Sequence, residues 1–292
     1  MVISNVIGGL GNQMFQYAAG RALAIAQGSD FLVDVSDLNA SPQHQGFELS
    51  RVFNCPISRA DSEHVRAVLG WQSSRAVRDF FTHSWLTAFR SRHLVIEPHF
   101  DYWPGFRKLL PPSYLMGYWQ SEHYFHEIAD VIHDDFKFHR PLTGQNLALD
   151  ARISETNSVS LHVRRGDYVS NPHAYATHGV CSIHYYEAAI KHVAERIPSP
   201  NFYIFSDDMQ WVRSHLEVRH PCCYVDNNIG ADSYIDMQLM SHCKHNIVAN
   251  SSFSWWGAWL NRNADKLVVA PSRWFANNTK TPDLLPSTWV AL

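Results

Sequence analysis

The stretch Ser158-Val159-Ser160-Leu161-His162-Val163-Arg164-Arg165-Gly166-Asp167-Tyr168-Val169 decides how this chain is expected to fold. Its first half alternates small or polar residues with apolar ones, and two β-branched valines favour a strand. The strand runs directly into two arginines, a glycine that permits a sharp turn and an aspartate that can bond to nearby amides. In an open α/β sheet ligands bind at the carboxyl ends of strands, and two guanidinium groups there suit a diphosphate. The alternative interpretation is a basic surface turn without a ligand.

Length and composition restrict the class of protein. With 292 residues, of which 46% are hydrophobic and 17% charged, the chain can bury a large core and form one large or two ordinary domains. The formal net charge is −3 and no long basic run occurs, which argues against nucleic acid as a main partner. The 5 cysteines are odd in number and show no C-x-x-C spacing, which favours a reducing compartment.

The chain shows no segment of the kinds that direct or anchor a protein at a membrane. Residues 1–10 carry neither a basic region nor a cleavage-like site, so we expect no signal peptide. No run of about eighteen apolar residues appears, so we expect no transmembrane segment. Peripheral attachment to a membrane stays open.

The second half of the chain has a regular rhythm of strands and helices. Pro141 and Gly144 break the pattern just before it, and we place the domain boundary near residues 140–155, dividing the chain into 1–150 and 151–292. Alternation at this spacing predicts a parallel, doubly wound α/β sheet. The expected strands after the first are 202–205, 222–225, 245–249 and 266–270, and the expected helices include 183–196, 211–216 and 233–241.

The first residues resemble a nucleotide-binding unit. A strand at 2–7 leads into Gly8-Gly9-Leu10-Gly11-Asn12-Gln13, and a helix then continues to Gly28. A strand, a glycine loop and a helix N-terminus together make an anion site, and Asp34 follows the next strand at the distance that a dinucleotide fingerprint requires. Met14 stands where the third glycine should be, so an NAD-type oxidoreductase is a minority hypothesis. Further on we expect a strand at 114–119 and an amphipathic helix at 123–138.

Polar residues gather at the ends of three expected strands in the second half. Arginines, hydroxyls and backbone amides suit phosphates, whereas carboxylates suit ribose hydroxyls or guanine amino groups. Because parallel strands end at one edge of a sheet, the three groups predict a nucleotide site there. They are His162 with Arg164, Arg165 and Asp167; Ser206 with Asp207 and Asp208; and Asn250 with Ser251, Ser252 and Ser254.

Other motifs favour structural roles. His242, Cys243 and His245 are too loosely spaced to predict a metal site. No Asp-x-Asp occurs, so we expect arginines and no metal or other cofactor to neutralise a diphosphate. No G-x-S-x-G nucleophile elbow is present. The aromatic run from Phe253 to Trp259 is expected to pack in the core.

Five blocks together resemble the bacterial α-1,2-fucosyltransferases. The H-x-R-R-x-D block at 162–167 is similar to one that this family shares with α-1,6- and protein O-fucosyltransferases. The likeness covers nearly the whole chain, and its longest block is very specific. Residues 56–113 match least, and we expect acceptor choice to reside there. The blocks are Gly8 to Tyr17, Gly117 to Ser121, His162 to Tyr168, Tyr203 to Asp208 and Asn250 to Asn261.

The resemblance implies a GT-B-like fold, with two Rossmann-like domains facing across a cleft. The N-terminal domain would serve the acceptor and carry the glycine loop, and the C-terminal domain would bind GDP-β-L-fucose. The implied reaction moves L-fucose with inversion to the 2-hydroxyl of a terminal galactose, without a metal. In O-antigen synthesis such an enzyme would work in the cytoplasm, with peripheral contact at the inner membrane face left open. The implied catalytic residues are Arg164, Arg165 and Asp167, and the implied donor-binding residues are Gly9, Gly11, Asn12, His162, Arg164, Arg165, Asp207, Asp208, Asn250, Ser251, Ser252 and Phe253.

Two questions stay open at this point. An inverting displacement needs a base near the acceptor hydroxyl, and Asp167, Asp34, Glu48 and the phosphate oxygen of the donor are all candidates. A non-catalytic sugar-nucleotide or glycan-binding module built on the same fold is a further hypothesis, and the intact arginine pair speaks against it.

Overall fold

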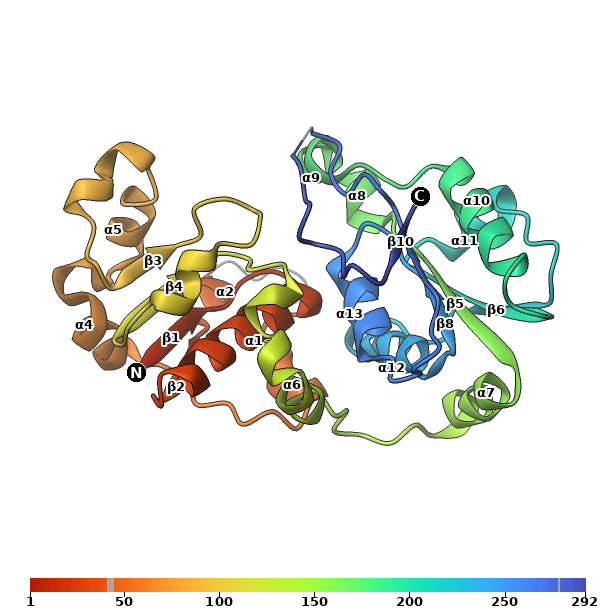
Figure 1. The fold of residues 1–292 in the computed structure, drawn as a ribbon, viewed down its shortest axis with the longest axis horizontal. Coiled ribbons are helices and arrows are strands. Elements are labelled where there is room, and N and C mark those ends of the chain that lie inside the picture. Colours follow the sequence, from red (N-terminus) through yellow and green to blue (C-terminus); the bar gives the residue numbers. More distant parts are fainter. Residues whose placement is uncertain (41–44, 278) are drawn as a thin grey trace. The chain divides into compact units, whose positions relative to one another are not determined.

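A computed structural model describes residues 1–40, 45–277 and 279–292 and divides them into two compact units (Figure 1). Unit 1 comprises Met1–His139 with Pro282–Leu284, and unit 2 comprises Arg140–Thr281 with Leu285–Leu292. The division falls at residue 140, the lower end of the range 140–155 in which the sequence places the boundary. Helix α7 (Gly144–Glu155) belongs to unit 2, because it packs on β5 (Asn157–Val163) and α12 (Tyr234–His242).

The sheet of unit 1 has four parallel strands in the order β2-β1-β4-β3. In β1, Val2 pairs with Phe31 on one side and with Ser113 on the other. Three of the strands lie where the sequence predicts them, although β1 and β4 are shorter. The sequence did not predict the remaining strand, β3, which lies in the region whose pattern was hardest to interpret. The bounds are β1 (Val2–Asn5), β2 (Phe31–Asp34), β3 (Leu94–Ile96) and β4 (Ser113–Met116).

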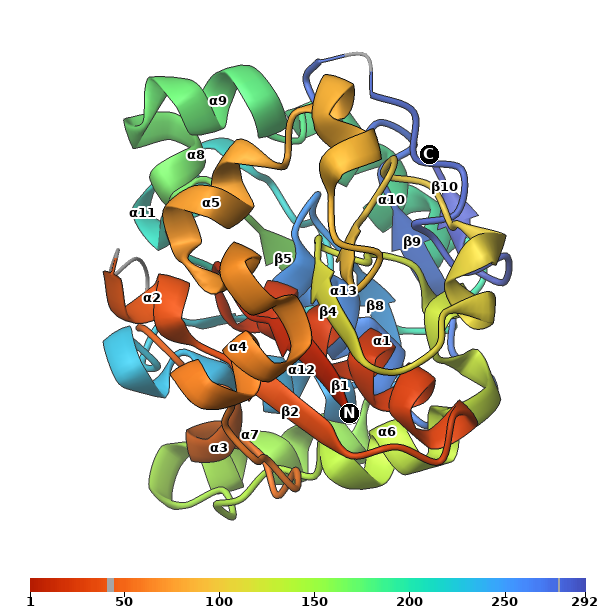
Figure 2. The same cartoon turned by 90° about the vertical axis from the view of Figure 1, so that its left-hand side faces the viewer.

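Helices cover both faces of this sheet. Tyr17 of α1 (Leu10–Ala26) packs its ring against Phe31 and against Phe136, which follows α6 (Ala129–Asp135). The opposite face carries α4 (Ser62–Leu69) and α5 (Arg75–Phe80), which lie in front of the strands in Figure 2. The sheet is therefore doubly wound. The apolar core on the α4 side is formed by Ile3, Leu32, Val65, Val68, Leu69, Phe81, Leu86, Leu94 and Tyr114.

The helix expected over residues 123–138 is broken in the structure. Phe125 leaves helical geometry, with φ −139° and ψ 4°, and buries its ring almost completely. The demand of the core for this ring overrides the amphipathic pattern, and only α6 is α-helical. The remaining elements of unit 1 are α2 (Ser36–Ala40), α3 (Leu49–Val52) and the 3₁₀ turns η1 (Gly70–Ser73), η2 (Ser84–Phe89), η3 (Pro104–Lys108), η4 (Glu122–Tyr124) and η5 (His126–Ile128).

Unit 2 contains the doubly wound parallel sheet that the sequence predicts. Its six strands follow the order β10-β9-β8-β5-β6-β7, and every pairing is parallel. Strand β5 occupies a central position, so the residues that follow it lie in the middle of the carboxyl edge. The strands are β5 (Asn157–Val163), β6 (Pro200–Ser206), β7 (Cys222–Val225), β8 (His245–Ile247), β9 (Val268–Ala270) and β10 (Val290–Ala291).

The two faces of this sheet differ in chemistry. Helices α10 and α11 pack on an apolar face, whereas α7, α12 and α13 lie on the other side (Figure 1). On the second face the buried amide of Asn246 donates to Ser160 Oγ and to the carbonyl oxygen of Met240. Trp255 and Trp256 are fully buried, as predicted for the aromatic run. The helices are α8 (Gly166–Ser170), α9 (Pro172–His178), α10 (Ile183–Ala194), α11 (Met209–His215), α12 (Tyr234–His242) and α13 (Ser252–Leu260), with the turn η6 (Gly230–Asp232).

Within the described residues, no helix combines the length and the apolar character needed to cross a bilayer.

Candidate active site

The arginine pair and the aspartate pair meet at the carboxyl edge of the unit 2 sheet. Strands β5 and β6 end side by side, with Val163 paired to Ser206. The residues that follow each strand therefore lie next to one another. Arg164 Nη1 is 2.7 Å from Asp207 Oδ2, and the backbone N–H of Arg165 donates to Asp207 Oδ1 at 2.8 Å. The structure thus brings together two of the three predicted polar groups.

Each arginine is held by a second carboxylate and by an aromatic ring. Arg164 Nη2 lies 2.5 Å from Asp167 Oδ1, and its guanidinium carbon is 5.2 Å from the centre of the Tyr168 ring. Arg165 Nε lies 3.1 Å from Asp208 Oδ2, and its guanidinium carbon is 3.8 Å from the centre of the ring of Trp211. These contacts fix both guanidinium groups before any ligand arrives, which is the condition for electrostatic preorganisation.

Gly166 allows this close approach. A Cβ atom at this position would lie 2.5 Å from Asp207 Oδ2, well inside van der Waals contact. The glycine of the H-x-R-R-x-D block is therefore required for packing against the neighbouring strand end.

His162 stands at the end of β5 and is 5% exposed. Its ring centre lies 5.8 Å from that of Phe253 in the first turn of α13. Burial lowers the pKa of His162 to about 4, although nearby Asp207 acts in the opposite direction. The imidazole is therefore neutral at pH 7. It can donate or accept a hydrogen bond but adds no positive charge to the arginine pair.

In the loop after β8, two of the predicted donor-binding residues, Asn250 and Ser251, make hydrogen bonds within the protein. The amide of Asn250 donates to the carbonyl oxygens of His178 and Trp274, at 2.9 and 3.1 Å, and its Oδ1 accepts from Cys181 Sγ. Asn250 therefore uses both ends of its side chain to join three loops. Ser251 caps α13, because its Oγ accepts from the N–H of Phe253 at 3.3 Å. Ser252 and Phe253 are partly exposed and begin the helix.

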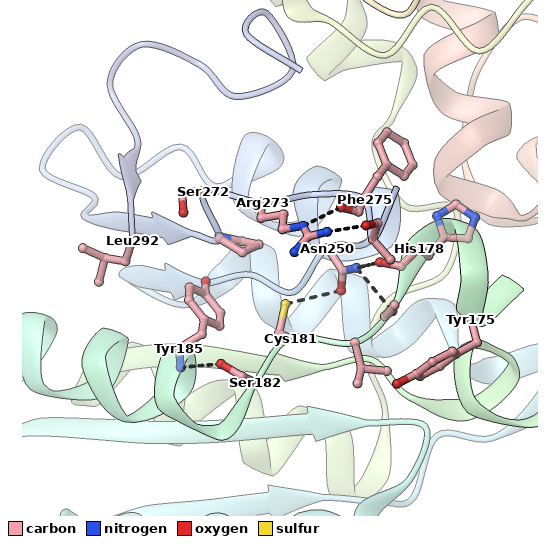
Figure 3. Close-up of a pocket in the computed structure, with 14 residues that line it drawn as sticks. Tyr175, His178, Cys181, Ser182, Tyr185, Asn250, Ser272, Arg273, Phe275 and Leu292 are labelled. Carbon is pink, nitrogen blue, oxygen red and sulfur yellow. Dashed lines mark hydrogen bonds between the residues drawn. The ribbon is translucent and has the colours of Figure 1, made fainter. Parts of the chain in front are cut away.

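A cavity of about 450 Å³ opens beside this loop (Figure 3). It lies where β8, β9 and β10 end, and its lining combines the Tyr175 and Phe275 rings with Ser182, Ser272 and Arg273. Arg273 turns its guanidinium to the carbonyl oxygens of Phe275 and Ala276. Burial raises the pKa of the Cys181 thiol to about 11, so this lining group is neutral. The cavity has the mixed aromatic and polar character of a small-molecule site.

The glycine loop of unit 1 is held by buried glutamines. Gln13 Nε2 donates to the carbonyl oxygen of Gly8 at 2.9 Å, and Gln16 Oε1 accepts from the N–H of Ile7 at 2.9 Å. Both glutamines are fully buried, whereas Asn12 is partly exposed and accepts at its Oδ1 from Gln120 Nε2 at 2.8 Å. Gly9 is the N-cap of α1, and Gly11 lies buried within its first turn. Of the predicted donor-binding residues in this loop, Asn12 is the polar side chain that a ligand can reach.

The carboxylate that a dinucleotide fingerprint would use is engaged elsewhere. Asp34 is 2% exposed, accepts from Tyr114 Oη at 2.5 Å and from the N–H of Ser36 at 2.9 Å, and lies near Arg78. It is therefore not placed to accept from ribose hydroxyls. This removes the main structural support for the oxidoreductase hypothesis.

The two histidines of the loosely spaced group at 242–245 also have hydrogen-bond partners within the protein. His242 Nδ1 lies 2.6 Å from Asp150 Oδ1, and His245 Nδ1 accepts from the N–H of Leu267 at 3.0 Å. Among the described residues, no three His, Cys, Asp or Glu side chains are grouped so that they could hold a metal ion.

The sequence analysis did not identify Trp211 as a residue of the site. The only feature of the sequence that could have indicated it is its position three residues after Asp208, in the first turn of a helix.

The family model described as glycosyl transferase family 11 matches residues 72–292. The chain belongs to this family. It is 34% identical over 299 residues to an Escherichia coli α-1,2-colitosyltransferase, an alignment that covers 100% of this chain and 99% of that protein. It is 36% identical to the E. coli O-antigen biosynthesis glycosyltransferase WbnK, over 98% of each chain. A galactoside α-(1,2)-fucosyltransferase 2 from Sus scrofa is 26% identical over 88% of this chain and 68% of its own length. The resemblance seen in the sequence is thereby confirmed.

Solved structures agree on the fold. The α-1,6-fucosyltransferase NodZ soaked with GDP-fucose aligns with a TM-score of 0.52 at 16% identity, over 89% of this chain and 91% of NodZ. The fucosyltransferase NodZ from Bradyrhizobium aligns with a TM-score of 0.51 at 16% identity, over 88% of this chain and 91% of NodZ. At this identity the likeness shows the fold alone, which is of the GT-B type with two Rossmann-like units.

Proposed function

We propose that this glycosyltransferase moves L-fucose from GDP-β-L-fucose to the 2-hydroxyl of a terminal galactose, with inversion. The observation that carries the proposal is the fixed pair Arg164 and Arg165 at the carboxyl end of β5. Family membership and the activity named for the Sus scrofa relative support the sugar and the linkage. An intact, preorganised cationic pair favours an enzyme over a module that only binds sugar nucleotides.

In this reaction the bond between the anomeric carbon and the β-phosphate oxygen breaks while the bond to the acceptor oxygen forms. Negative charge develops on the departing GDP, and the sugar becomes oxocarbenium-like. Arg164 and Arg165 would bind that charge, and Asp167, Asp207 and Asp208 would hold the two guanidinium groups in place. His162, Ser252 and Phe253 are further proposed donor contacts, and Asn12 is the proposed contact from unit 1.

We also propose that the reaction needs no divalent metal. Two arginines supply the positive charge at the proposed diphosphate site, and the chain contains no Asp-x-Asp. The expected acceptor is a galactoside of an O-antigen precursor or a free oligosaccharide that ends in galactose, in keeping with the O-antigen role named for WbnK. We expect the enzyme to act in the cytoplasm.

Colitose is the second candidate sugar, because a relative that is 34% identical over the full chain is named as a colitosyltransferase. Colitose is fucose without its 3-hydroxyl. A site that bonds to this hydroxyl should prefer fucose strongly, whereas a site without such a partner accepts both sugars. The same arginine pair would serve either donor, because both carry GDP.

The deciding experiment incubates the protein with lactose and either GDP-fucose or GDP-colitose in the presence of EDTA, and follows GDP and the trisaccharide. A product with fucose on the 2-hydroxyl of galactose is the expected result. Colitose transfer alone would overturn the assignment of the sugar. GDP release without a fucosylated product from any galactoside tested would overturn the assignment of the acceptor. Donor binding with no turnover at all would overturn the proposal of an enzyme in favour of a module that only binds sugar nucleotides.

A further inference from the structure

The carboxylate of Glu97 lies at the carboxyl edge of the unit 1 sheet. Glu97 directly follows β3, whose last residue Ile96 pairs with Met116, the last residue of β4. Its Oε2 accepts from the N–H of Tyr118 at 2.7 Å, and its Oε1 accepts from the N–H of Trp119 at 3.0 Å. Two successive backbone amides of the turn after β4 thus bind the two oxygens of one carboxylate.

The turn is shaped to make this contact. Gly117 packs directly on the acid, because a Cβ atom there would lie 2.4 Å from the Cβ of Glu97 and 2.7 Å from its Oε2. Trp119 is fully buried and has a φ of 56°, a backbone conformation that bulky residues rarely adopt. Strain of this kind is kept where the surrounding structure enforces it, and it often marks functional sites.

The same turn is tied to the glycine loop. Gln16 Nε2 donates to the carbonyl oxygen of Gly117 at 3.1 Å, and Gln120 Nε2 donates to Asn12 Oδ1 at 2.8 Å. The block Gly117 to Ser121, whose purpose the sequence did not reveal, therefore joins Glu97 to the partly exposed Asn12. The turn, Asn12 and Glu97 form one cluster within unit 1.

Glu97 differs from every carboxylate that the sequence suggested as a base. Asp167 is 2.5 Å from Arg164, Glu48 is 2.6 Å from Arg51, and Asp34 is buried against Tyr114 and Arg78. Glu97 has no lysine or arginine at ion-pair distance among the described residues and remains partly exposed. The titratable groups beside it are the phenols of Tyr118 and Tyr124, whose pKa values are raised by burial and by Glu97 itself.

Its protonation behaviour suits proton transfer near neutral pH. Burial raises the pKa of Glu97 to about 7, although the amides of Tyr118 and Trp119 act in the opposite direction. A general base is most effective when its pKa lies near the working pH. Tyr118 is 41% exposed, so the ring next to the carboxylate offers a surface on which a sugar can stack.

We propose that Glu97 is the general base that takes the proton from the galactose 2-hydroxyl, with the galactoside held on unit 1 over Tyr118. The inference rests on the proposed transferase function. As the bond between the anomeric carbon and GDP breaks, the acceptor oxygen forms its bond to that carbon and gives its proton to a carboxylate oxygen of Glu97. GDP leaves with the electron pair of the broken bond, and the proton later passes to water.

The test compares the wild-type protein with Glu97→Gln and Glu97→Ala. The matched control is Glu127→Gln, because Glu127 lies in the same unit but is exposed and paired with Arg107. Wild-type kcat should fall below pH 7 as Glu97 is protonated. Both Glu97 variants should lose at least about 100-fold in kcat and lose this pH dependence, while GDP binding stays unchanged. The control should behave like the wild type.

Two further readouts keep the test decisive. Formate should restore part of the activity of Glu97→Ala and none to Glu97→Gln, because a small carboxylate can fill the space left in the first variant only. Thermal unfolding shows whether the variants fold. If the wild type transfers fucose and Glu97→Gln retains its kcat and pH profile, or if formate fails to rescue a folded Glu97→Ala, Glu97 is not the base. If the wild type transfers no sugar to any galactoside, the proposed function itself fails.

Discussion

The charged side chains at the carboxyl edges of the two sheets have different kinds of partner. In unit 2, Arg164 and Arg165 are surrounded by Asp167, Asp207 and Asp208, and every one of these charges has an opposite partner. In unit 1, Glu97 is bound by backbone amides, with no cation paired to it among the described residues. Paired arginines keep their positive charge at any physiological pH, whereas an unpaired, half-buried carboxylate can exchange a proton near neutral pH. The first arrangement suits a leaving group, and the second suits an acceptor hydroxyl.

The largest expected effect comes from the arginines. Arg164→Ala and Arg165→Ala should each lower kcat with GDP-fucose by roughly 100- to 1,000-fold, since a charge-assisted contact to the departing GDP is lost, at a cost of about 3–4 kcal/mol. Steady-state kinetics measure the effect. Arg196→Ala, at an exposed position just after α10, is the control and should have wild-type activity. Full activity in both single variants of the pair would refute the proposed donor site.

Two glycines sharpen the comparison, since each one lets a carboxylate approach the backbone. Gly166→Ala should push Asp207 away from the arginines and weaken GDP binding by about tenfold, or ~1.4 kcal/mol. Gly117→Ala should displace Glu97 and lower kcat with no change in GDP affinity. Calorimetry with GDP and kinetics separate the two effects. The proposed separation of roles, with GDP binding on unit 2 and the general base on unit 1, would be contradicted if Gly117→Ala weakened GDP binding as much as Gly166→Ala does.

The other acids of unit 1 should matter for stability and not for chemistry. Asp34→Asn leaves the buried Arg78 with a weaker partner, and we expect the free energy of unfolding to fall by about 1–3 kcal/mol. Glu48→Gln should have a smaller effect, because its partner Arg51 is one-third exposed. Denaturant unfolding measures both. A loss of kcat of more than about 100-fold in either folded variant would make that acid a better candidate for the base than Glu97.

The smallest expected effect is that of a chelator. Because arginines neutralise the diphosphate in the proposed mechanism, EDTA should leave the rate of transfer unchanged, and added Mg²⁺ or Mn²⁺ should not raise it more than slightly. Initial rates with and without EDTA test this directly. Complete loss of activity that Mn²⁺ restores would mean that the diphosphate is bound in a different way.

The sequence predicted unit 2 better than unit 1 for a physical reason. Three strands of unit 2 are followed by polar clusters, so the meeting of the clusters that contain Arg164 and Asp207 followed from parallel pairing. In unit 1 the strand β3 has three residues, and the helix expected at 123–138 breaks because the core takes the ring of Phe125. Short strands and breaks of this kind depend on tertiary packing, which sequence periodicity does not record.

The candidate site shows the same contrast. The H-x-R-R-x-D block identified the arginines, because their charge is visible in the sequence. It did not reveal that Asp208 both holds Arg165 and caps α11, or that Trp211 lies under the guanidinium. No motif in the sequence indicated Glu97, because its partners are the backbone amides of Tyr118 and Trp119. Roles that depend on backbone geometry became visible only in the folded structure.

The most direct test of the account is the rate of fucose transfer as a function of pH in single turnovers, measured together with GDP affinity for the wild type, Arg165→Ala and Glu97→Gln. The account predicts that Arg165→Ala is slower at every pH and binds GDP more weakly, yet keeps the fall in rate below pH 7. It predicts that Glu97→Gln binds GDP normally and loses this pH dependence. A fall below pH 7 that persists unchanged in Glu97→Gln, or GDP affinity that does not change in Arg165→Ala, would contradict it.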